Sequence, residues 1–204
     1  MTTASVLSRC AAAAVLAMAG SGVHANLLTN GSFEDNLIDP PGVWEHQNPP
    51  PGWTVSGSGS GPVIFSNSYL GGPVGAGSQA AQLEWHTQAL SQQFATVLNQ
   101  PYELSFMVSG YNAALAPLNV AVGPVFGNYV GANGTWTTHT LSFTGTGSPM
   151  TVTFTNTGGA AGTYGFYPHI DNVSVTAVPE PSAYALALAG LGVMGLLGRR
   201  RKAV

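Results

Sequence analysis

The sequence predicts an all-β domain, an antiparallel β-sandwich or jelly roll, between two terminal targeting segments. Apolar residues recur at every second position over several short segments, which is the pattern of strands with one buried face. Gly, Asn and Pro residues separate these segments, as they do between the strands of sandwiches. No long segment has the period of an α-helix, and no internal repeat is present. The length between the two ends suits one domain with its own core.

Residues 1–25 have the features of a secretory signal peptide. Arg9 is their only cation, residues 10–20 form an apolar run, and a small-residue cleavage site precedes Asn26. A buried helix is a poor alternative because the apolar run is short and lies at the terminus. Cys10 is the only cysteine and would leave with this segment, so we expect no disulfide in the exported domain.

Residues 178–204 combine three elements in a fixed order. A Pro-Glu-Pro motif is followed by an apolar segment, residues 183–198, and then by a basic cluster, residues 199–202. A charge-free apolar segment that ends in cations is typical of a membrane span whose basic end stays in the cytoplasm. The segment is slightly shorter than the ~17–25 residues of a stable span, which argues against the alternative of a plain permanent anchor.

This order of elements resembles the PEP-CTERM sorting signal, in which a Pro-Glu-Pro motif precedes a short transmembrane helix and a cluster of arginines. The resemblance implies that an exosortase-type membrane enzyme processes the tail, and that the chain then reaches the cell surface or the extracellular space. Contact with the membrane would be limited to the C-terminal helix before processing. The residues that carry the motif are Pro179, Glu180, Pro181, Arg199, Arg200 and Arg201.

Residues 26–177 are the predicted jelly-roll domain, and the alternation of apolar residues defines its strands. The last of these segments changes parity between Ile170 and Val173, which predicts a β-bulge there. Residues 36–52, with several prolines, and residues 56–61, which alternate Ser and Gly, are expected to be loops. The expected strands are 27–29, 53–56, 63–66, 80–85, 89–94, 102–108, 118–122, 137–143, 150–154 and 171–177.

The charged side chains of this domain are all acidic, because it contains no Lys and no Arg. Its seven carboxylates are Glu34, Asp35, Asp39, Glu45, Glu84, Glu103 and Asp171. Binding of nucleic acid requires cations that displace phosphate counterions, so this function is excluded. Anionic lipid headgroups and phosphorylated substrates are disfavoured for the same reason. A divalent cation or a neutral ligand such as a sugar is compatible with the charge.

Several segments of the domain resemble one group of proteins. Residues 26–34 (NLLTNGSFE), 51–55 (PGWTV), 77–84 (GSQAAQLE), 90–94 (LSQQF), 102–106 (YELSF) and 170–175 (IDNVSV) are similar to DUF642-type and choice-of-anchor domains, which are related to carbohydrate-binding jelly rolls. The resemblance implies the galactose-binding-like jelly-roll fold. It also implies a structural Ca²⁺ ion, because in such modules an acidic residue after the opening segment and an aspartate in the last strand help to hold the metal.

The residues that match this metal site are Glu34 and Asp171, with Asn30 as a further oxygen donor. Ca²⁺ binds ~6–8 oxygen ligands, which carboxylates and carbonyls can supply. Asp171 shares parity with Val173 and Val175, so we expect it to face the interior, where an unpaired carboxylate is costly. In the alternative, Asp171 accepts hydrogen bonds from backbone amides or is protonated, and Glu34 is merely exposed.

A sugar site is the second expectation, because aromatic rings stack on pyranose faces while polar side chains bond the hydroxyls. Trp53 and Trp136 lie at strand starts and are expected in the core. The aromatic residues with polar neighbours are better candidates for ligand contact, although core or rim packing is the alternative for each. The candidates are Trp44, Trp85, His86, Tyr111 and Tyr167.

No motif predicts catalysis. The histidines have no zinc-binding spacing, no Gly-x-Ser-x-Gly nucleophile motif is present, and nothing places two carboxylates as a glycosidase pair. The function that the sequence favours is therefore a non-catalytic exported protein that binds polysaccharide in an exopolysaccharide or biofilm matrix. The alternatives are a structural or adhesion protein that acts through protein contacts, and a glycan-active enzyme.

Overall fold

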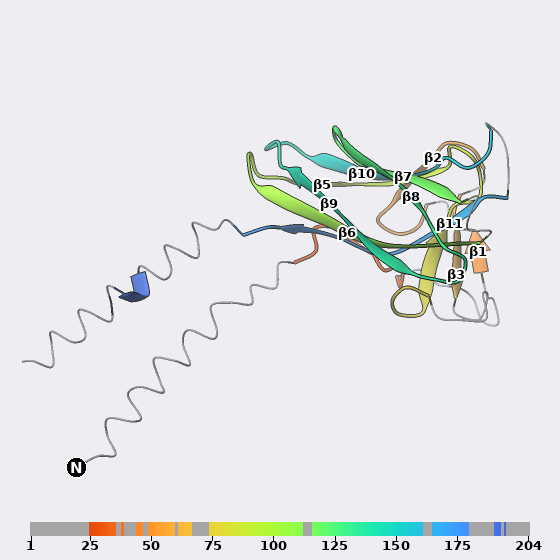
Figure 1. Ribbon diagram of the computed structural model, residues 1–204, viewed down its shortest axis with the longest axis horizontal. Helices are drawn as coiled ribbons and strands as arrows, with labels where there is room; N and C mark the ends of the chain where they lie inside the picture. The colour runs from red at the N-terminus through yellow and green to blue at the C-terminus, as the bar shows by residue number, and fades with distance from the viewer. Residues whose placement is uncertain are drawn as a thin grey trace, which may run out of the picture.

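The fold is a sandwich of two antiparallel β-sheets (Figure 1). The computed structural model describes residues 25–35, 38, 44–46, 49–59, 61–66, 74–111, 116–160, 165–179, 190–192 and 194. The strands are β1 (Trp44–His46), β2 (Thr54–Ser56), β3 (Val63–Ser66), β4 (Gln79–Gln82), β5 (Ala89–Phe94), β6 (Pro101–Tyr111), β7 (Pro117–Val122), β8 (Val125–Val130), β9 (Thr137–Thr144), β10 (Met150–Asn156) and β11 (Tyr167–Ala177).

The two sheets have different strand orders. The six-stranded sheet runs β1-β3-β4-β11-β6-β9, and the five-stranded sheet runs β2-β5-β10-β7-β8. The long strands β6 and β11 pair in the middle of the first sheet, and β10 lies in the middle of the second. All the strand pairings are antiparallel. The predicted all-β jelly-roll sandwich is therefore confirmed.

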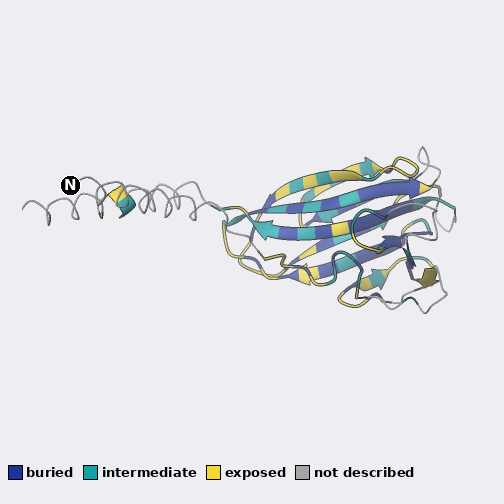
Figure 2. Ribbon diagram, turned by 90° about the horizontal axis from the view of Figure 1, so that it is seen from below, coloured by how far each residue is buried: buried dark blue, intermediate teal, exposed yellow. Residues whose placement is uncertain are grey.

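The core lies between the sheets and is built from the alternating apolar residues. Every second residue of β6, β7 and β10 is buried, and Figure 2 shows the resulting stripes along the strands. Phe106 from the six-stranded sheet meets Phe154 from the five-stranded sheet edge to face, with ring centroids 5.4 Å apart. The ring centroid of Trp53 lies 5.4 Å from that of Phe33 and 6.1 Å from that of Phe154, so Trp53 belongs to the core as expected. Burial of each such side chain stabilises the fold by roughly 1.5–3 kcal/mol.

Residues 26–178 contain both sheets and the whole described core. The main cluster extends from Leu28 to Val175. A smaller cluster lies on the outer face of the six-stranded sheet and consists of Val63, Phe65, Val74 and Ala80. Because no apolar contact of these clusters needs a residue outside this segment, it forms a folding unit with its own core.

The predicted bulge in the last strand is confirmed. The register of β11 against β6 shifts between Asp171 and Ser174, and Asn172 adopts a left-handed conformation with φ of 47°. Asn tolerates this conformation better than most residues, so the extra residue is accommodated at low cost. As a result, the side chains before and after Asn172 follow different parities.

Two parts of the strand prediction were wrong. Residues 27–29 form bends because Asn30, with φ of 48°, turns the chain; Leu27 N–H nevertheless donates to Val175 O (2.9 Å). The predicted strand 80–85 ends at Gln82. Strands β1 and β8 were not predicted. In β8 Phe126 and Val130 point outward, while the inward residues are partly buried and also apolar, so its alternation is hidden.

The two ends of the domain lie together at one end of the sandwich (Figure 1). Asn26 Nδ2 donates to Val173 O (3.0 Å), and Val175 N–H donates to Asn26 Oδ1 (2.9 Å). At the other terminus, Val178 N–H donates to Pro101 O (2.9 Å) and Val178 O accepts from Gln100 Nε2 (2.7 Å). The start of β11 is at the opposite end.

Most of the predicted targeting segments lie outside the described residues. These include the signal peptide up to residue 24, the sorting residues Glu180, Pro181, Arg199, Arg200 and Arg201, and most of the predicted helix 183–198. Gly190, Leu191, Gly192 and Met194 are helical. In the portion of the chain that is described, none of the helices is both long and apolar enough to cross a membrane.

Candidate functional site

The outer face of the six-stranded sheet gathers buried polar side chains. The registers place His169 between Gln82 on β4 and Ser109 on β6, and all three are buried. His169 Nε2 and Gln82 Oε1 are 2.8 Å apart. The neighbouring residues Ile170 and Val108 point to the core instead. This face therefore has a polar character that the core lacks.

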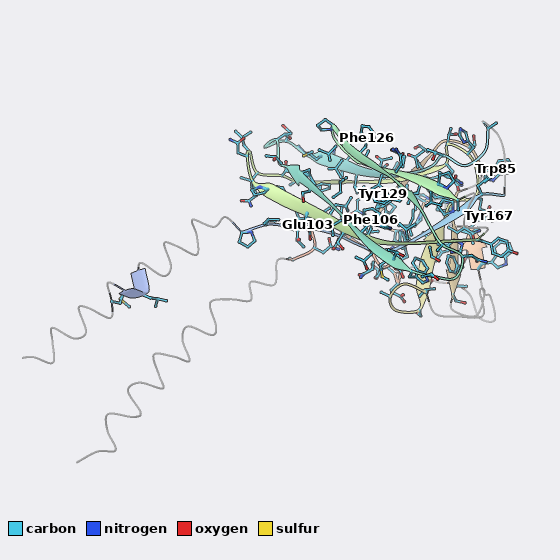
Figure 3. The ribbon with its side chains drawn as sticks, in the orientation of Figure 1. Trp85, Glu103, Phe106, Phe126, Tyr129 and Tyr167 are labelled. Atoms are coloured by element: carbon cyan, nitrogen blue, oxygen red, sulfur yellow. The ribbon has the colours of Figure 1, made fainter. Side chains whose placement is uncertain are left out.

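An aromatic pair extends this face at the end where β11 begins. Tyr167 pairs with Tyr111 across β11 and β6, and their ring centroids are 5.9 Å apart at 56°. Tyr111 is half exposed and Tyr167 is partly buried. Trp85 lies at the same end as Tyr167 (Figure 3). We call Trp85, His86, Tyr111 and Tyr167 the aromatic end of the sandwich.

The turn that carries Trp85 and His86 is held on both sides. Leu83 N–H donates to Pro168 O (3.1 Å), so the chain continues beside β11 after β4 ends. Gln88 N–H then donates to Trp85 O (3.0 Å), which closes the turn. His86 Nδ1 is 3.1 Å from Gly158 O.

Asn156, a fully buried residue at the end of β10, joins the loops of the aromatic end. Its Nδ2 donates to Phe166 O (2.6 Å), and its Oδ1 accepts from Gly158 N–H (2.8 Å). Thr87 N–H donates to the backbone oxygen of Asn156 (2.8 Å). Removal of this amide would leave buried backbone groups without a partner, at a cost of about 1–3 kcal/mol for each group.

Gly59 allows the loop after β2 to lie against the indole of Trp85. A Cβ atom at this position would overlap Trp85 Cδ1, and the φ of 95° favours glycine. The indole is partly buried as a result. Trp85 is thus held in place by the loop rather than projecting freely into solvent.

Glu84 is a site residue that the sequence argument did not single out. It is only 7% exposed, and Gln82 Nε2 donates to Glu84 Oε1 (3.3 Å). Because Leu83 N–H donates to Pro168 O, Glu84 follows directly after a residue that is bonded to the first part of β11. A carboxylate near the aromatic end provides an acceptor for ligand hydroxyl groups. Its position directly before Trp85 was the available signal in the sequence.

The structure does not bring Trp44 to the aromatic end. Trp44 is on β1, the outermost strand of the sheet, where it pairs with Phe65 and its ring lies 5.5 Å from that of His46. Strands β3 and β4 separate it from β11. Four of the five predicted ligand residues therefore share one end, and the fifth lies apart from them.

The two predicted metal ligands, Glu34 and Asp171, both accept hydrogen bonds from the segment between β3 and β4. Ala76 N–H donates to Asp171 Oδ2 (2.6 Å), and Asn172 N–H donates to Asp171 Oδ1 (2.6 Å). Ser78 donates to Glu34 through N–H (2.7 Å) and through Oγ (2.6 Å), and Gln79 N–H donates as well (2.8 Å). The pair thus fastens this segment to the sheet.

Asp171 is fully buried, but it does not face the core with Val173 and Val175 as its parity suggested. The bulge at Asn172 changes the parity, so Asp171 shares the outer face with His169 and lies under Gly75. This is a correction to the expected orientation. The backbone hydrogen bonds of Asp171 agree with the alternative interpretation of this residue.

The environment shifts the two carboxyl pKa values in opposite directions. Burial raises the pKa of Asp171 to about 7; the amides of Ala76 and Asn172 act against this, and the charge of Glu34 adds to it. Burial also acts to raise the pKa of Glu34, but the hydrogen bonds from Ser78 and Gln79 outweigh it and hold the pKa below its usual value. Near neutral pH Glu34 is therefore ionised, whereas Asp171 is protonated in a substantial fraction of the molecules.

The described donor set does not match a calcium cage. Every carboxylate oxygen of Glu34 and Asp171 accepts an N–H or O–H group, and these groups place partial positive charge where a cation would sit. Asn30 Oδ1 accepts from Asp35 N–H (3.1 Å), so it is engaged elsewhere. Within the described part of the chain, no three His, Cys, Asp or Glu side chains cluster as a metal site. The donor set therefore argues against the calcium ion that the family resemblance implies, and the Tm of the domain with and without calcium tests its binding directly.

The two histidines near the core do not provide an acid or base near neutral pH. Burial lowers the pKa of His169 to about 3, and its ring packs 4.8 Å from Phe65 and 6.2 Å from Trp136. Burial also lowers the pKa of His139, which lies 4.7 Å from Tyr129. Both are neutral packing residues at pH 7.

Two family descriptions match the chain. The model described as "Protein of unknown function (DUF642)" matches residues 26–176, and the PEP-CTERM protein-sorting motif matches residues 177–202. The sorting motif supports an exported protein that is sorted through the membrane, and it implies processing by an exosortase-type enzyme. A comparison with curated proteins found no match.

Solved structures share the fold at low sequence identity. TmCBM61 in complex with beta-1,4-galactotriose has a TM-score of 0.50 and 17% identity over 76% of this chain and 99% of its own. A putative sugar binding protein from Bacteroides thetaiotaomicron VPI-5482 has a TM-score of 0.50 and 11% identity over 76% and 100%. The enzymatically active domain of tailspike protein 4 from bacteriophage CBA120 has a TM-score of 0.51 and 15% identity over 75% and 21%.

Proposed function

Because the chain belongs to the DUF642 family over residues 26–176 and ends in a PEP-CTERM sorting motif, we propose that it is an exported, non-catalytic protein that binds a neutral polysaccharide at its aromatic end. After sorting, it would act on the cell surface or in an exopolysaccharide or biofilm matrix.

One observation supports this site above the others: Tyr111 pairs with Tyr167 at the end of the sandwich where Trp85 also lies. The two tyrosines come from strands far apart in the sequence, and their rings are 5.9 Å apart. Aromatic faces of this kind stack on sugar rings, and Glu84 supplies an acceptor for hydroxyl groups. The absence of Lys and Arg from residues 26–177 favours a neutral glycan over an anionic one.

The similar structures support the ligand class. One of them is in complex with beta-1,4-galactotriose, and another is described as a putative sugar binding protein. Both are covered almost entirely by this chain, so the similarity extends over the whole sandwich. A galactose-containing oligosaccharide is therefore a reasonable first probe.

The test is a glycan array on residues 26–178, followed by isothermal titration with the best ligand. Tyr111→Ala should weaken binding about tenfold or more, because a central aromatic contact is lost. Tyr167→Ala should act in the same direction. Failure of the wild-type domain to bind any neutral glycan would overturn the proposal.

Phe126→Ala is the matched control, because Phe126 is another exposed aromatic residue but lies on β8 of the other sheet. It should leave the sugar affinity unchanged. Trp44→Ala decides whether β1 also contributes to the site. Equal loss in the Tyr111 and Phe126 variants would indicate a general effect on folding rather than a binding site at the aromatic end.

A further inference from the structure

Strand β8 (Val125–Val130) is an exposed edge of the five-stranded sheet. It pairs with β7 on one side, and among the described strands no other one pairs with it. Phe126 is 65% exposed and Val130 is 58% exposed, and Asn128 between them is also exposed. Tyr129 points the other way, between the sheets, where it packs 5.0 Å from Phe106 (Figure 3).

The hairpin geometry sets which backbone groups of β8 face outward. β7 and β8 are joined by the two-residue turn Gly123-Pro124, in which Gly123 has φ of 58°, as the first position of a type II′ turn requires. The pair that closes such a turn, Val122 and Val125, is hydrogen-bonded, and hydrogen-bonded pairs then alternate along an antiparallel ladder. Pro117, which has no N–H, pairs with Val130 and so falls at a position without such bonds.

It follows that Phe126, Asn128 and Val130 direct their backbone N–H and C=O groups to the free edge. The same three residues carry the exposed side chains, since Val125, Gly127 and Tyr129 alternate with them. The edge therefore combines free hydrogen-bonding groups with two large apolar side chains. Such an edge is a template for another strand unless charge, proline or a bulge protects it.

This edge has none of those protections among the described residues. β8 contains no charged residue and no proline, and residues 104–170 carry no Asp, Glu, Lys or Arg at all. The register of β8 against β7 is continuous, so no bulge turns the edge away. The basic C-terminal tail and the carboxylates, whose like charges would repel a second copy, are located elsewhere in the sequence.

We propose that β8 pairs with β8 of a second copy of this chain in an antiparallel, two-fold symmetric contact centred on Asn128. In this register Asn128 of one copy lies opposite Asn128 of the other. Phe126 of each copy lies opposite Val130 of the other copy. Each of these residue pairs exchanges two backbone hydrogen bonds, because all three residues face the edge. The two five-stranded sheets then form one continuous sheet.

The register is set by the side chains. A shift by one residue would place the outward Phe126 opposite an inward position, which the pleat forbids. A shift by two residues would place Phe126 opposite Asn128 and lose the apolar cross-strand pairs. Of the two edge strands of the other sheet, β9 presents Thr138, Thr140 and Ser142 and so offers no comparable apolar contact. The other, β1, carries the charged Glu45, which protects an edge against pairing.

Asn128→Cys tests the geometry directly in residues 26–178, which hold no other cysteine. Cross-strand residues in hydrogen-bonded pairs have Cα atoms about 5.5 Å apart, within the range that a disulfide spans. Under mild oxidation this variant should form a covalent dimer in high yield. Thr153→Cys, on the central strand β10, and Ser142→Cys, on β9, are the matched controls and should stay largely monomeric.

Charge reversal tests the contact without a covalent bond. Sedimentation of wild-type residues 26–178 over a wide concentration range should show a monomer–dimer equilibrium. Asn128→Lys and Asn128→Asp should each weaken it at least about tenfold, because like charges then face each other across the two-fold axis. An equimolar mixture of the two variants should restore the dimer.

Two results would overturn the proposal. One is a wild-type domain that stays monomeric at every concentration, and the other is equal crosslinking of the variants at positions 128, 142 and 153. Tyr111→Ala should dimerise normally, so the failure of sugar binding and the failure of self-association are distinguishable.

Discussion

The six-stranded sheet directs Tyr111, Tyr167 and buried polar groups to its outer face, whereas the five-stranded sheet directs threonines and other uncharged residues outward. Among the described strands, every carboxylate lies on the six-stranded sheet: Glu45, Glu103 and Asp171. The strands of the five-stranded sheet contain no charged residue. One sandwich thus combines an outer face with an aromatic pair and buried polar groups and a second sheet whose strands carry no charge. The fold tolerates both because the core between the sheets is common to them.

The largest effect on stability should come from the core, to which both sheets contribute buried side chains in the same way. Phe106→Ala in the six-stranded sheet and Phe154→Ala in the five-stranded sheet should each lower the free energy of unfolding by about 3–5 kcal/mol, since both rings are fully buried and in contact. Urea unfolding of residues 26–178 measures this. A loss confined to one of the two variants would show that the sheets unfold separately.

The next effect is a pH dependence that only the six-stranded sheet should confer. Burial raises the pKa of Asp171 from 3.8 to about 7, so the protonated carboxyl favours the folded state. Its stabilising contribution is complete below about pH 4 and is lost as the pH rises to about 7, by roughly 2–4 kcal/mol. His169 acts in the opposite direction, because burial lowers its pKa to about 3 and its contribution is lost as the pH falls. Asp171→Asn should therefore make the unfolding free energy rise more steeply with pH in this window than in the wild type.

Thr153→Val on the outer face of the five-stranded sheet is the control for this measurement, because it removes no titratable group. It should keep the wild-type slope. Glu34 acts in the opposite sense: its lowered pKa means that its contribution is present above its usual pKa and lost in more acidic solution. An Asp171→Asn variant with an unchanged slope would contradict the assignment of the titration to Asp171.

Gly59→Ala should have a smaller effect on stability. It distinguishes the two regions because it perturbs the aromatic end but not β8. The added Cβ overlaps the indole of Trp85, and φ of 95° is strained for alanine. We expect a loss of about 1–3 kcal/mol in the unfolding free energy and weaker sugar binding. Dimer formation should be unaffected. Unchanged binding despite a shifted Trp fluorescence would mean that Trp85 is not a ligand residue.

Calcium should have the smallest effect. Since the oxygens of Glu34 and Asp171 accept N–H and O–H groups, addition of Ca²⁺ or of a chelator should leave the Tm of residues 26–178 unchanged. Differential scanning calorimetry with and without the metal is the measurement. A rise of several degrees with calcium, abolished in Glu34→Gln, would establish the site that the family resemblance implies.

The fold could be predicted from sequence where apolar and polar residues alternate strictly, as in β6, β7 and β10. β8 was missed because its two faces are both apolar. The aromatic candidates were recognisable by residue type, but the pairing of Tyr111 with Tyr167 depends on a long-range register that local patterns do not contain. Four of the five candidates share an end for that reason, and Trp44 does not.

Asn156 shows what a closer analysis of parity could have found. Asn156 has the same parity as the buried residues Met150, Val152 and Phe154. The pattern therefore predicts a polar side chain at an interior position. A buried amide at such a place must bond to backbone groups, and this one joins the loops of the aromatic end. For Asp171 the same parity argument failed, because the bulge at Asn172 reverses the face.

The C-terminal end of the domain lies at the opposite end of the sandwich from the aromatic end. β11 is 11 residues long and begins at Tyr167, while its last residue adjoins Val178 and the sorting motif. At ~3.3 Å per residue the strand spans roughly 35 Å. A chain held by its C-terminal side with β11 perpendicular to the surface would place Tyr111 and Tyr167 several screening lengths from that surface, since charge is screened within about 8 Å at physiological salt. Headgroup composition and ionic strength should then have little influence on capture of a neutral glycan.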